Sequence, residues 1–298
     1  MKITGLHLIL TYQCNFECDH CFVWGSPWQK GVMTLENIER ILQQGKRAGS
    51  VTSIYFEGGE PFLYYGTLLK GVQMASMLGF EIGIVSNAYW ATGYADALET
   101  LKPFQGLLAD LTVSSDLFHY DEKLSQQSQN ATRAAKALEI PVGTICVALP
   151  EEADAAHTQG QIPPGEGSVM YRGRAVAKLA SQASQHPWQE FTQCPHEDLR
   201  NPGRIHVDPF GYLHLCQGIV IGNLYRQNLD AISAAFDPDA NPISGALLSG
   251  GPARLVETYG LTTGPGYADA CHLCYSAREQ LRKRYPEILT PDGMYGVL

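Results

Sequence analysis

The sequence has no long apolar run, no excess of basic residues and no recognisable secretory signal. No stretch approaches the roughly 20 apolar residues that span a bilayer, so no membrane-spanning helix is predicted. With 21 Lys and Arg against 30 Asp and Glu, the net charge of −9 argues against a nucleic-acid-binding surface and leaves room for no more than a local basic patch. The N-terminus lacks a small-residue cleavage site, so we expect a cytoplasmic protein with reduced thiols.

Charged residues are sparse, at 17% against 45% hydrophobic residues, and no repeat of 20–50 residues is present. A chain of 298 residues with this composition is expected to bury a sizeable core. Apolar runs at 6–12, 51–56, 80–85, 107–113, 140–149 and 168–171 predict six strands. Helical spacing predicts helices over 35–48 behind a Thr34 cap, then over 66–78, 92–101, 127–138 and 175–184. This alternation favours an α/β fold with a parallel sheet, either open or curled into a partial barrel.

The pattern changes after about residue 186. Gly, Pro and Asn become frequent and long periodic segments become rare, apart from a helix predicted over 276–285. Residues 237–252 are expected to form a loop or a weak helix flanked by turns. The predicted division is therefore 1–185 and 186–298, with a small, loop-rich second unit that a metal site holds together.

Seven of the eight cysteines fall into two groups. Clustered cysteines in a reducing compartment indicate metal ligands before disulfides. The first group, Cys14, Cys18 and Cys21, has the spacing C-x3-C-x2-C and follows the first predicted strand. Three thiolates on a short loop suit three corners of a [4Fe–4S] cluster and leave the fourth iron open. A zinc site that recruits His20, or three structural thiols, are the alternatives.

A second motif, Glu57-Gly58-Gly59-Glu60-Pro61, ends the second predicted strand. Its two glycines allow a ligand to approach the backbone closely, although most such turns are only turns. The cysteine motif after strand one and GGEP after strand two, in this order, together resemble the radical SAM superfamily over about residues 1–185.

The resemblance implies a partial (βα)6 barrel of TIM type and two cofactors. Cys14, Cys18 and Cys21 would bind a [4Fe–4S] cluster, whose open iron chelates the methionine part of S-adenosylmethionine (SAM). Reductive cleavage of SAM gives a 5′-deoxyadenosyl radical that takes a hydrogen atom from the substrate. An electron donor of flavodoxin or ferredoxin type is implied as a partner.

The resemblance also suggests SAM contacts. His20 matches an aromatic position before the last cysteine, where Tyr or Phe is commoner, and Ile145 lies on a strand similar to the adenine-contacting one. Polar residues at strand ends suit ribose and carboxylate groups, with helix capping as the alternative, and Arg172 is equally compatible with a solvated surface. The cofactor-binding candidates are His20, Gly58, Gly59, Glu60, Ser86, Asn87, Ser114, Ile145 and Arg172.

The second group of cysteines is Cys194, Cys216, Cys271 and Cys274. Four thiolates close a site completely, for zinc or for a second [4Fe–4S] cluster. Behind a radical SAM core, this set is similar to the auxiliary-cluster extensions called SPASM and twitch domains. A full SPASM domain has more cysteines, so the shorter twitch form with one cluster is expected.

Three further residues are candidates for chemistry on the substrate. Cys146 belongs to neither group and lies on the fifth predicted strand, where it is either a hydrogen-atom donor or a packing residue. Asp116 and His119 follow the fourth strand, where an acid or base is well placed to move a proton. Capping of the next helix is the competing interpretation for Asp116.

Two enzymatic functions follow from these motifs. The first is oxidation or rearrangement of a small molecule, such as a sugar, aminocyclitol or nucleoside derivative. The second is maturation of a peptide or protein by a thioether, a C–C crosslink or an oxidised side chain. The chain begins at the first predicted strand, and we take this as favouring the small molecule. A non-enzymatic zinc or redox-sensing module is a third interpretation, which the GGEP motif opposes.

Overall fold

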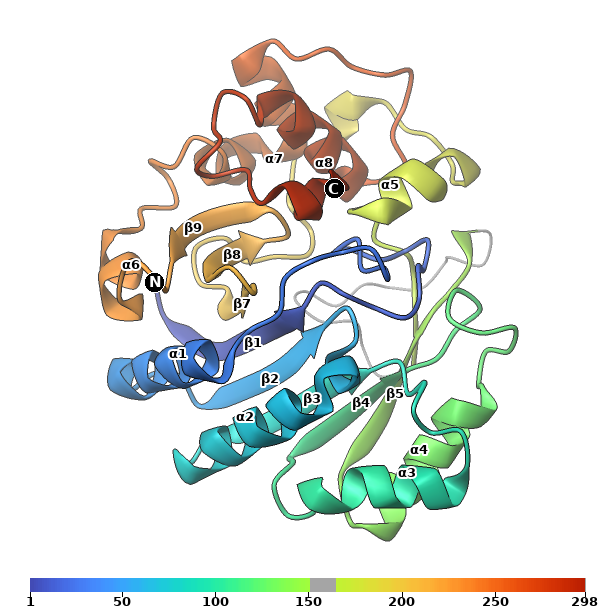
Figure 1. Cartoon of the computed structure of the whole chain (residues 1–298). Helices are drawn as coiled ribbons and strands as arrows, with labels where there is room; N and C mark the ends of the chain where they lie inside the picture. Colours follow the sequence, from blue (N-terminus) through green and yellow to red (C-terminus); the bar gives the residue numbers. More distant parts are fainter. Residues whose placement is uncertain (151–164, 298) are drawn as a thin grey trace.

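A nine-stranded sheet organises the part of the chain that the computed structural model describes, residues 1–150 and 165–297 (Figure 1). Six strands pair in parallel in the order β6-β5-β4-β3-β2-β1. Their bounds are β1 (Ile3–Thr11), β2 (Ser53–Gly58), β3 (Glu81–Ser86), β4 (Asp110–Ser114), β5 (Val142–Val147) and β6 (Gly165–Gly167). The predicted α/β class with a parallel, partial-barrel sheet is confirmed.

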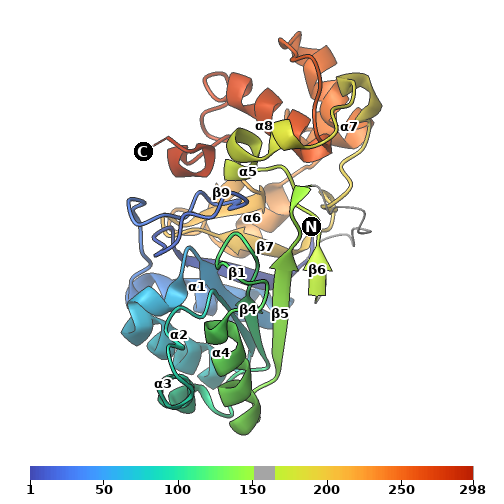
Figure 2. The same ribbon diagram turned by 90° about the vertical axis from the view of Figure 1, so that its right-hand side faces the viewer.

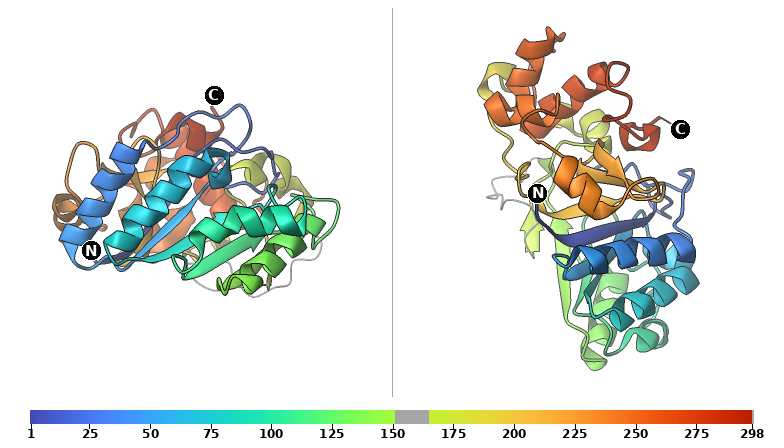
Figure 3. Two further views of the ribbon diagram at one scale, coloured as in Figure 1. Left: turned by 60° about the horizontal axis from the view of Figure 1, so that its bottom comes forward. Right: turned by 90° about the vertical axis from the view of Figure 1, so that its left-hand side faces the viewer.

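Four helices cover the outer face of this sheet, side by side (Figure 3). They are α1 (Leu35–Ala48), α2 (Tyr65–Met77), α3 (Tyr94–Leu101) and α4 (Gln126–Ala137), with 3₁₀ turns at Pro61–Tyr64 and Lys102–Phe104. As predicted, the Thr34 hydroxyl caps α1 by accepting from the Asn37 amide at 3.2 Å. Ile38, Ile41 and Leu42 then face the sheet and are fully buried. The opposite, concave face of the sheet is left for a site.

Three strands that the sequence did not predict extend the same sheet beyond β1. They are β7 (Gly203–Val207), β8 (Tyr212–Cys216) and β9 (Ile219–Asn223). β7 pairs with β1 in parallel, and β8 and β9 follow as antiparallel neighbours. Each has five residues and is separated from the next by a turn with Gly211 or Gly218 at positive φ, so the region looks loop-rich in sequence. The division into 1–185 and 186–298 stays a prediction.

The remaining helices follow β6 in the chain. They are α5 (Arg174–Lys178), α6 (Leu229–Ala235), α7 (Ser244–Tyr259) and α8 (Ala270–Leu281), with 3₁₀ turns at Ala180–Gln182, Trp188–Glu190 and Asp292–Tyr295. Figure 2 shows α5, α7 and α8 on one side of the sheet and α2, α3 and α4 on the other. In residues 1–150 and 165–297, no helix combines the length and the apolar character that crossing a membrane requires.

Four predicted elements need correction. The sixth strand is β6, so the strand predicted over 168–171 is wrong, and the helix predicted over 175–184 is only the short α5 and a 3₁₀ turn. The weak helix over 237–252 is displaced to α7, whose helical backbone breaks at Gly250 and Gly251. The last helix begins at Ala270 rather than near 276, because the Asp269 carboxylate caps it by accepting from the His272 amide at 2.7 Å.

Two hydrophobic cores hold these layers together. The larger lies between the parallel strands and helices α1 to α4. The second joins Ile9, Tyr12 and Val23, which surround the first cysteine group in sequence, to Leu215 on β8 and Tyr275 on α8. The C-terminal segment is therefore packed directly against the loop that follows β1.

Candidate active site

The first three cysteines lie together on the loop after β1. Cys14 and Cys18 are buried, with 8% and 7% of their surface exposed, and the Cys21 amide donates to the Cys18 carbonyl at 3.1 Å. Two backbone amides donate to the sulfurs: Phe16 to Cys14 at 3.4 Å and Gly25 to Cys21 at 3.1 Å. The sulfurs of Cys14 and Cys21 therefore each accept a backbone hydrogen bond within the loop.

Arg174 fixes this loop in place from the start of α5. Its guanidinium donates to the carbonyls of Cys18 and Gly25, both at 2.8 Å, and its amide donates to the Cys21 carbonyl at 3.0 Å. Gly173 (φ +63°) lets the chain pass so close that a β-carbon there would lie 2.6 Å from the Cys21 carbonyl. The segment after β6 thus contributes by holding the cysteine loop.

The backbone of the GGEP motif lies directly against the same loop. The Gly59 amide donates to the Thr11 carbonyl at 2.7 Å, and the Glu60 amide donates to the Gln13 carbonyl at 2.9 Å. Gly58 has a φ of +139°, and a β-carbon on it would lie 2.3 Å from the Thr11 oxygen. Both glycines are required here by the closeness of the two backbones.

Replacing Gly59 by alanine is expected to lower the free energy of unfolding by about 3 kcal/mol. A β-carbon at this position would lie 2.1 Å from the Gln13 carbonyl oxygen, and neither backbone can yield without breaking the paired loops. Gly66→Ala on α2 is the matched control, because nothing lies within 4 Å of its β-carbon position. Chemical denaturation of the two variants measures the difference; equal stabilities would contradict this account.

Glu60 lies behind the cavity wall and ties β2 to β3. Its buried carboxylate accepts from the Phe62 amide at 3.0 Å, the Ser86 hydroxyl at 3.0 Å and the Asn87 amide at 2.8 Å. Burial raises the pKa of Glu60 to about 7. The Asn87 side-chain amide reaches the Cys14 sulfur at 3.6 Å, so the end of β3 also contacts the cysteine loop.

Asp116 is the centre of a second polar group, after β4. One carboxylate oxygen lies 2.8 Å from His119 Nδ1, and the other lies 3.2 Å from His20 Nε2 and accepts from the Val147 amide at 3.2 Å. Burial alone would raise the pKa of Asp116, but the hydrogen bonds from His119 and His20 hold it well below its usual range. The ionised carboxylate therefore orients both imidazoles.

These groups open into one cavity of about 470 Å³ on the concave face of the sheet. Ser114 and Ile145 line it, as do Gly58, Gly59, Ser86 and Asn87. Gly143, Thr144, Ile145 and Val147 of β5 line the cavity, whereas Cys146 is not among the described residues that line it. Cys14, Cys18 and Cys21 lie in its wall together with His20, Asp116 and His119.

The four later cysteines line a second, small cavity of about 20 Å³. Cys271 and Cys274 come from the first turns of α8, Cys216 from the end of β8 and Cys194 from the loop before β7. Arg172 lies between the two cavities and lines both. Its guanidinium is 3.3 Å from the Glu197 carboxylate and 3.9 Å from the Cys216 sulfur, and it stacks over Phe22 at 5.2 Å.

Several cavity residues were missed by the sequence analysis. His7, Tyr55 and Asp110 lie in stretches that were interpreted only as apolar runs. Arg204 and His206 lie on β7, which the sequence did not predict, and Glu57 was noted only as the first residue of the second motif. A single polar residue inside such a run, such as His7 within Ile3–Thr11, is the signal that could have found them. It marks the strand face that points at a polar cavity rather than at the core.

A sequence model of the Radical SAM superfamily matches residues 8–157, which is half of the chain. The chain belongs to the radical SAM superfamily. The matched range includes the cysteine loop, the GGEP motif and the strand ends that line the larger cavity. The predicted membership is thereby confirmed.

The curated relatives match only part of the chain. A Bacillus subtilis protein named for peptide biosynthesis, YydG, is 29% identical over 111 residues, 37% of this chain and 35% of that protein. An S-adenosylmethionine-dependent nucleotide dehydratase of a Fibrobacter species is 27% identical over 134 residues, 40% of this chain and 36% of that protein. The chain thus spans about a third of the length of these relatives.

A solved structure supports the fold over a longer range. The crystal structure of BtrN in complex with AdoMet and 2-DOIA superposes with a TM-score of 0.51 at 15% identity. The match covers 78% of this chain and 82% of BtrN. At this identity the likeness describes the fold alone.

Membership in the radical SAM superfamily implies a [4Fe–4S] cluster and SAM, and the first cysteine loop fits a cluster. Thiolates around one zinc ion lie about 3.8 Å apart. Among the described residues, the sulfurs of Cys14, Cys18 and Cys21 do not all lie within 4.8 Å of one another. They are therefore spaced more widely than a single zinc ion requires. Burial raises the pKa of Cys14 to about 12, so a bound cation is needed to hold this thiolate. When bound, the cluster and SAM supply the radical that removes a substrate hydrogen atom.

Proposed function

We propose that this chain is a radical SAM enzyme with a second, auxiliary [4Fe–4S] cluster and that it oxidises a small polar molecule. One observation carries the proposal. The two cysteine sets line two cavities that share Arg172, His196 and Glu197 in their walls. A substrate in the larger cavity would therefore lie beside the proposed auxiliary cluster.

The four-cysteine set supports a cluster of the twitch type rather than zinc. As at the first loop, no three of these sulfurs lie within 4.8 Å of one another in the described part of the chain, whereas a tetrahedral zinc site needs them about 3.8 Å apart. Arg172 and Arg278, both buried, border the set. Two guanidinium groups offset the negative charge of a cluster held by four thiolates.

The overall reaction balances without an external oxidant. SAM and a secondary alcohol give methionine, 5′-deoxyadenosine, a ketone and one proton. The hydrogen atom leaves as part of 5′-deoxyadenosine, and a base takes the proton. The remaining electron returns to the protein-bound cofactors, which a flavodoxin or ferredoxin reduces at the start. His119, oriented by Asp116 at 2.8 Å in the cavity wall, is our candidate for the base.

The polar lining favours a small substrate with hydroxyl or amino groups. Carboxylates of Glu57 and Asp110 face the same cavity as the guanidinium of Arg204. A volume of about 470 Å³ is within the range of small-molecule sites. BtrN, the neighbour in fold, was crystallised with 2-DOIA as well as AdoMet, which is consistent with a small-molecule ligand here.

Peptide maturation is the second candidate. It is favoured by the similarity to YydG, whose name refers to peptide biosynthesis. In that case a peptide side chain would enter the same cavity, and the substrate would be a precursor peptide.

An anaerobic assay separates the two candidates. Reconstituted enzyme, SAM and dithionite are incubated with carbinol-deuterated cyclitols, sugars and nucleosides, or with a candidate precursor peptide. We expect one 5′-deoxyadenosine per ketone formed, with one deuterium transferred into it, for a small molecule. Turnover stimulated by the peptide alone would favour maturation, and transfer from neither class would contradict both proposals.

A further inference from the structure

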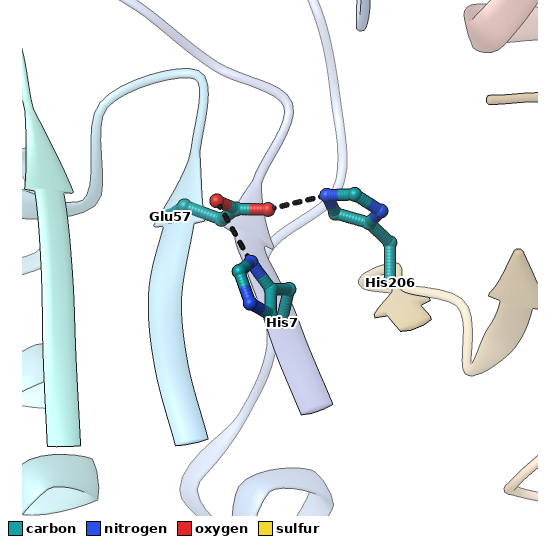
Figure 4. A group of neighbouring side chains, drawn as sticks. All are labelled: His7, Glu57 and His206. Atoms are coloured by element: carbon teal, nitrogen blue, oxygen red, sulfur yellow. Dashed lines mark hydrogen bonds and ion pairs between the residues drawn. The ribbon is translucent and has the colours of Figure 1, made fainter. Parts of the chain in front are cut away.

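Three side chains on three neighbouring strands meet inside the larger cavity. His7 lies on β1, Glu57 on β2 and His206 on β7, and β1 is hydrogen-bonded to both of the other strands. His7 pairs directly with His206 across β1 and β7, and on the other side with Tyr55, two residues before Glu57. All three side chains therefore project from the same face of the sheet (Figure 4).

One ligand atom from each of His7, Glu57 and His206 lies within 4.8 Å of the other two. His7 Nδ1 lies 3.4 Å from Glu57 Oε2, and His206 Nε2 lies 2.8 Å from Glu57 Oε1. Although it is this close to His206, the buried Oε1 atom accepts no hydrogen bond of normal geometry. A metal about 2.0–2.2 Å from each nitrogen and oxygen would fit such spacings.

The residue types of the group suit a cation. Glu57 offers carboxylate oxygens, and His7 and His206 offer imidazole nitrogens, which are ligands that first-row transition metals accept. His7 stacks on Tyr55 at 4.7 Å, and Phe22 packs against His206 at 5.7 Å, which fixes both rings.

We propose that His7, Glu57 and His206 form a binding site for one divalent first-row transition metal, facing the substrate cavity. Two imidazoles and one carboxylate on one side of an ion leave its other positions open, and here the open side is the cavity. A substrate hydroxyl or carbonyl oxygen bound there would be held and polarised by the metal. The proposal goes beyond the function proposed above and does not depend on the auxiliary cluster.

Binding of Mn²⁺ alone tests the site. Mn²⁺ binds poorly to thiolates, so we expect it not to bind to the cysteine sets. Free Mn²⁺ is measured by its electron paramagnetic resonance signal, to which oxidised, diamagnetic clusters do not contribute. Reconstituted enzyme is expected to remove one Mn²⁺ per chain from solution. Glu57→Gln and a His7→Ala, His206→Ala double variant should each weaken binding at least about tenfold.

Two controls keep this result interpretable. His186→Ala removes a half-exposed imidazole that lies 3.5 Å from Glu190, outside the cavity, and should leave Mn²⁺ binding unchanged. Iron content should stay the same in every variant, which shows that each has folded and holds its clusters. No bound Mn²⁺ up to millimolar concentration, or equal binding by Glu57→Gln, would overturn the proposal in favour of a metal-free group of two histidines and a carboxylate.

Discussion

Replacing Cys14, Cys18 and Cys21 together by alanine is expected to reduce SAM cleavage to the uncatalysed background and to remove about four of about eight iron atoms. We propose the three sulfurs as the protein ligands of the first cluster, and their loop is held by Arg174 through backbone carbonyls rather than through the thiols. The fold should therefore survive the change. Formation of 5′-deoxyadenosine, measured by chromatography, and iron per chain give the result.

Cys146→Ala is the matched control for this experiment. Cys146 lies on β5 between two residues that line the cavity, and it belongs to neither cysteine set. We expect full iron content and largely intact turnover. Persistent SAM cleavage in the triple variant would refute the assignment of the cluster. Complete loss of turnover in a folded, iron-loaded Cys146→Ala variant would return Cys146 to the list of catalytic candidates.

The second large effect is expected from Cys271→Ala with Cys274→Ala. Both sulfurs border the smaller cavity, so their loss should lower the iron content from about eight to about four atoms and abolish product formation. SAM cleavage should continue without coupling to product, because the first cysteine loop is intact. Iron, sulfide and 5′-deoxyadenosine per product are the measurements.

Zinc analysis of the same samples is the clearest test that could contradict this prediction. About four iron atoms and one zinc in the unmodified protein, with zinc lost from the double variant, would make the second site structural. The reaction would then be expected to be redox-neutral. Unchanged iron content in the double variant would remove the auxiliary cluster from the proposal.

The parallel half of the fold was predictable because its signals are local. An apolar run forms each strand, and a capped amphipathic segment such as the one behind Thr34 forms the helix that follows. The cysteine and GGEP motifs were predictable for the same reason, since each lies within a few residues at a strand end. Their contact, through Gly59 and the Thr11 carbonyl, follows from the pairing of β1 with β2.

The rest depends on contacts between residues far apart in sequence. β7 pairs with β1, which lies about 200 residues earlier, and this pairing brings His206 beside His7. The local sequence of β7 does not indicate this partner. The position of Arg172 between two cavities likewise needs α8 and β8 to pack over the segment after β6.

The pairing of β7 with β1 also limits how this protein can be divided or recombined. A fragment ending near residue 185 would leave β1 with an unpaired edge, which invites association with other chains. It would also lose the covering that Leu215 and Tyr275 give to the residues around the cysteine loop. The cofactor-binding half is therefore not an interchangeable module, and a chimera with a relative would have to join the two chains beyond β9, not before β7.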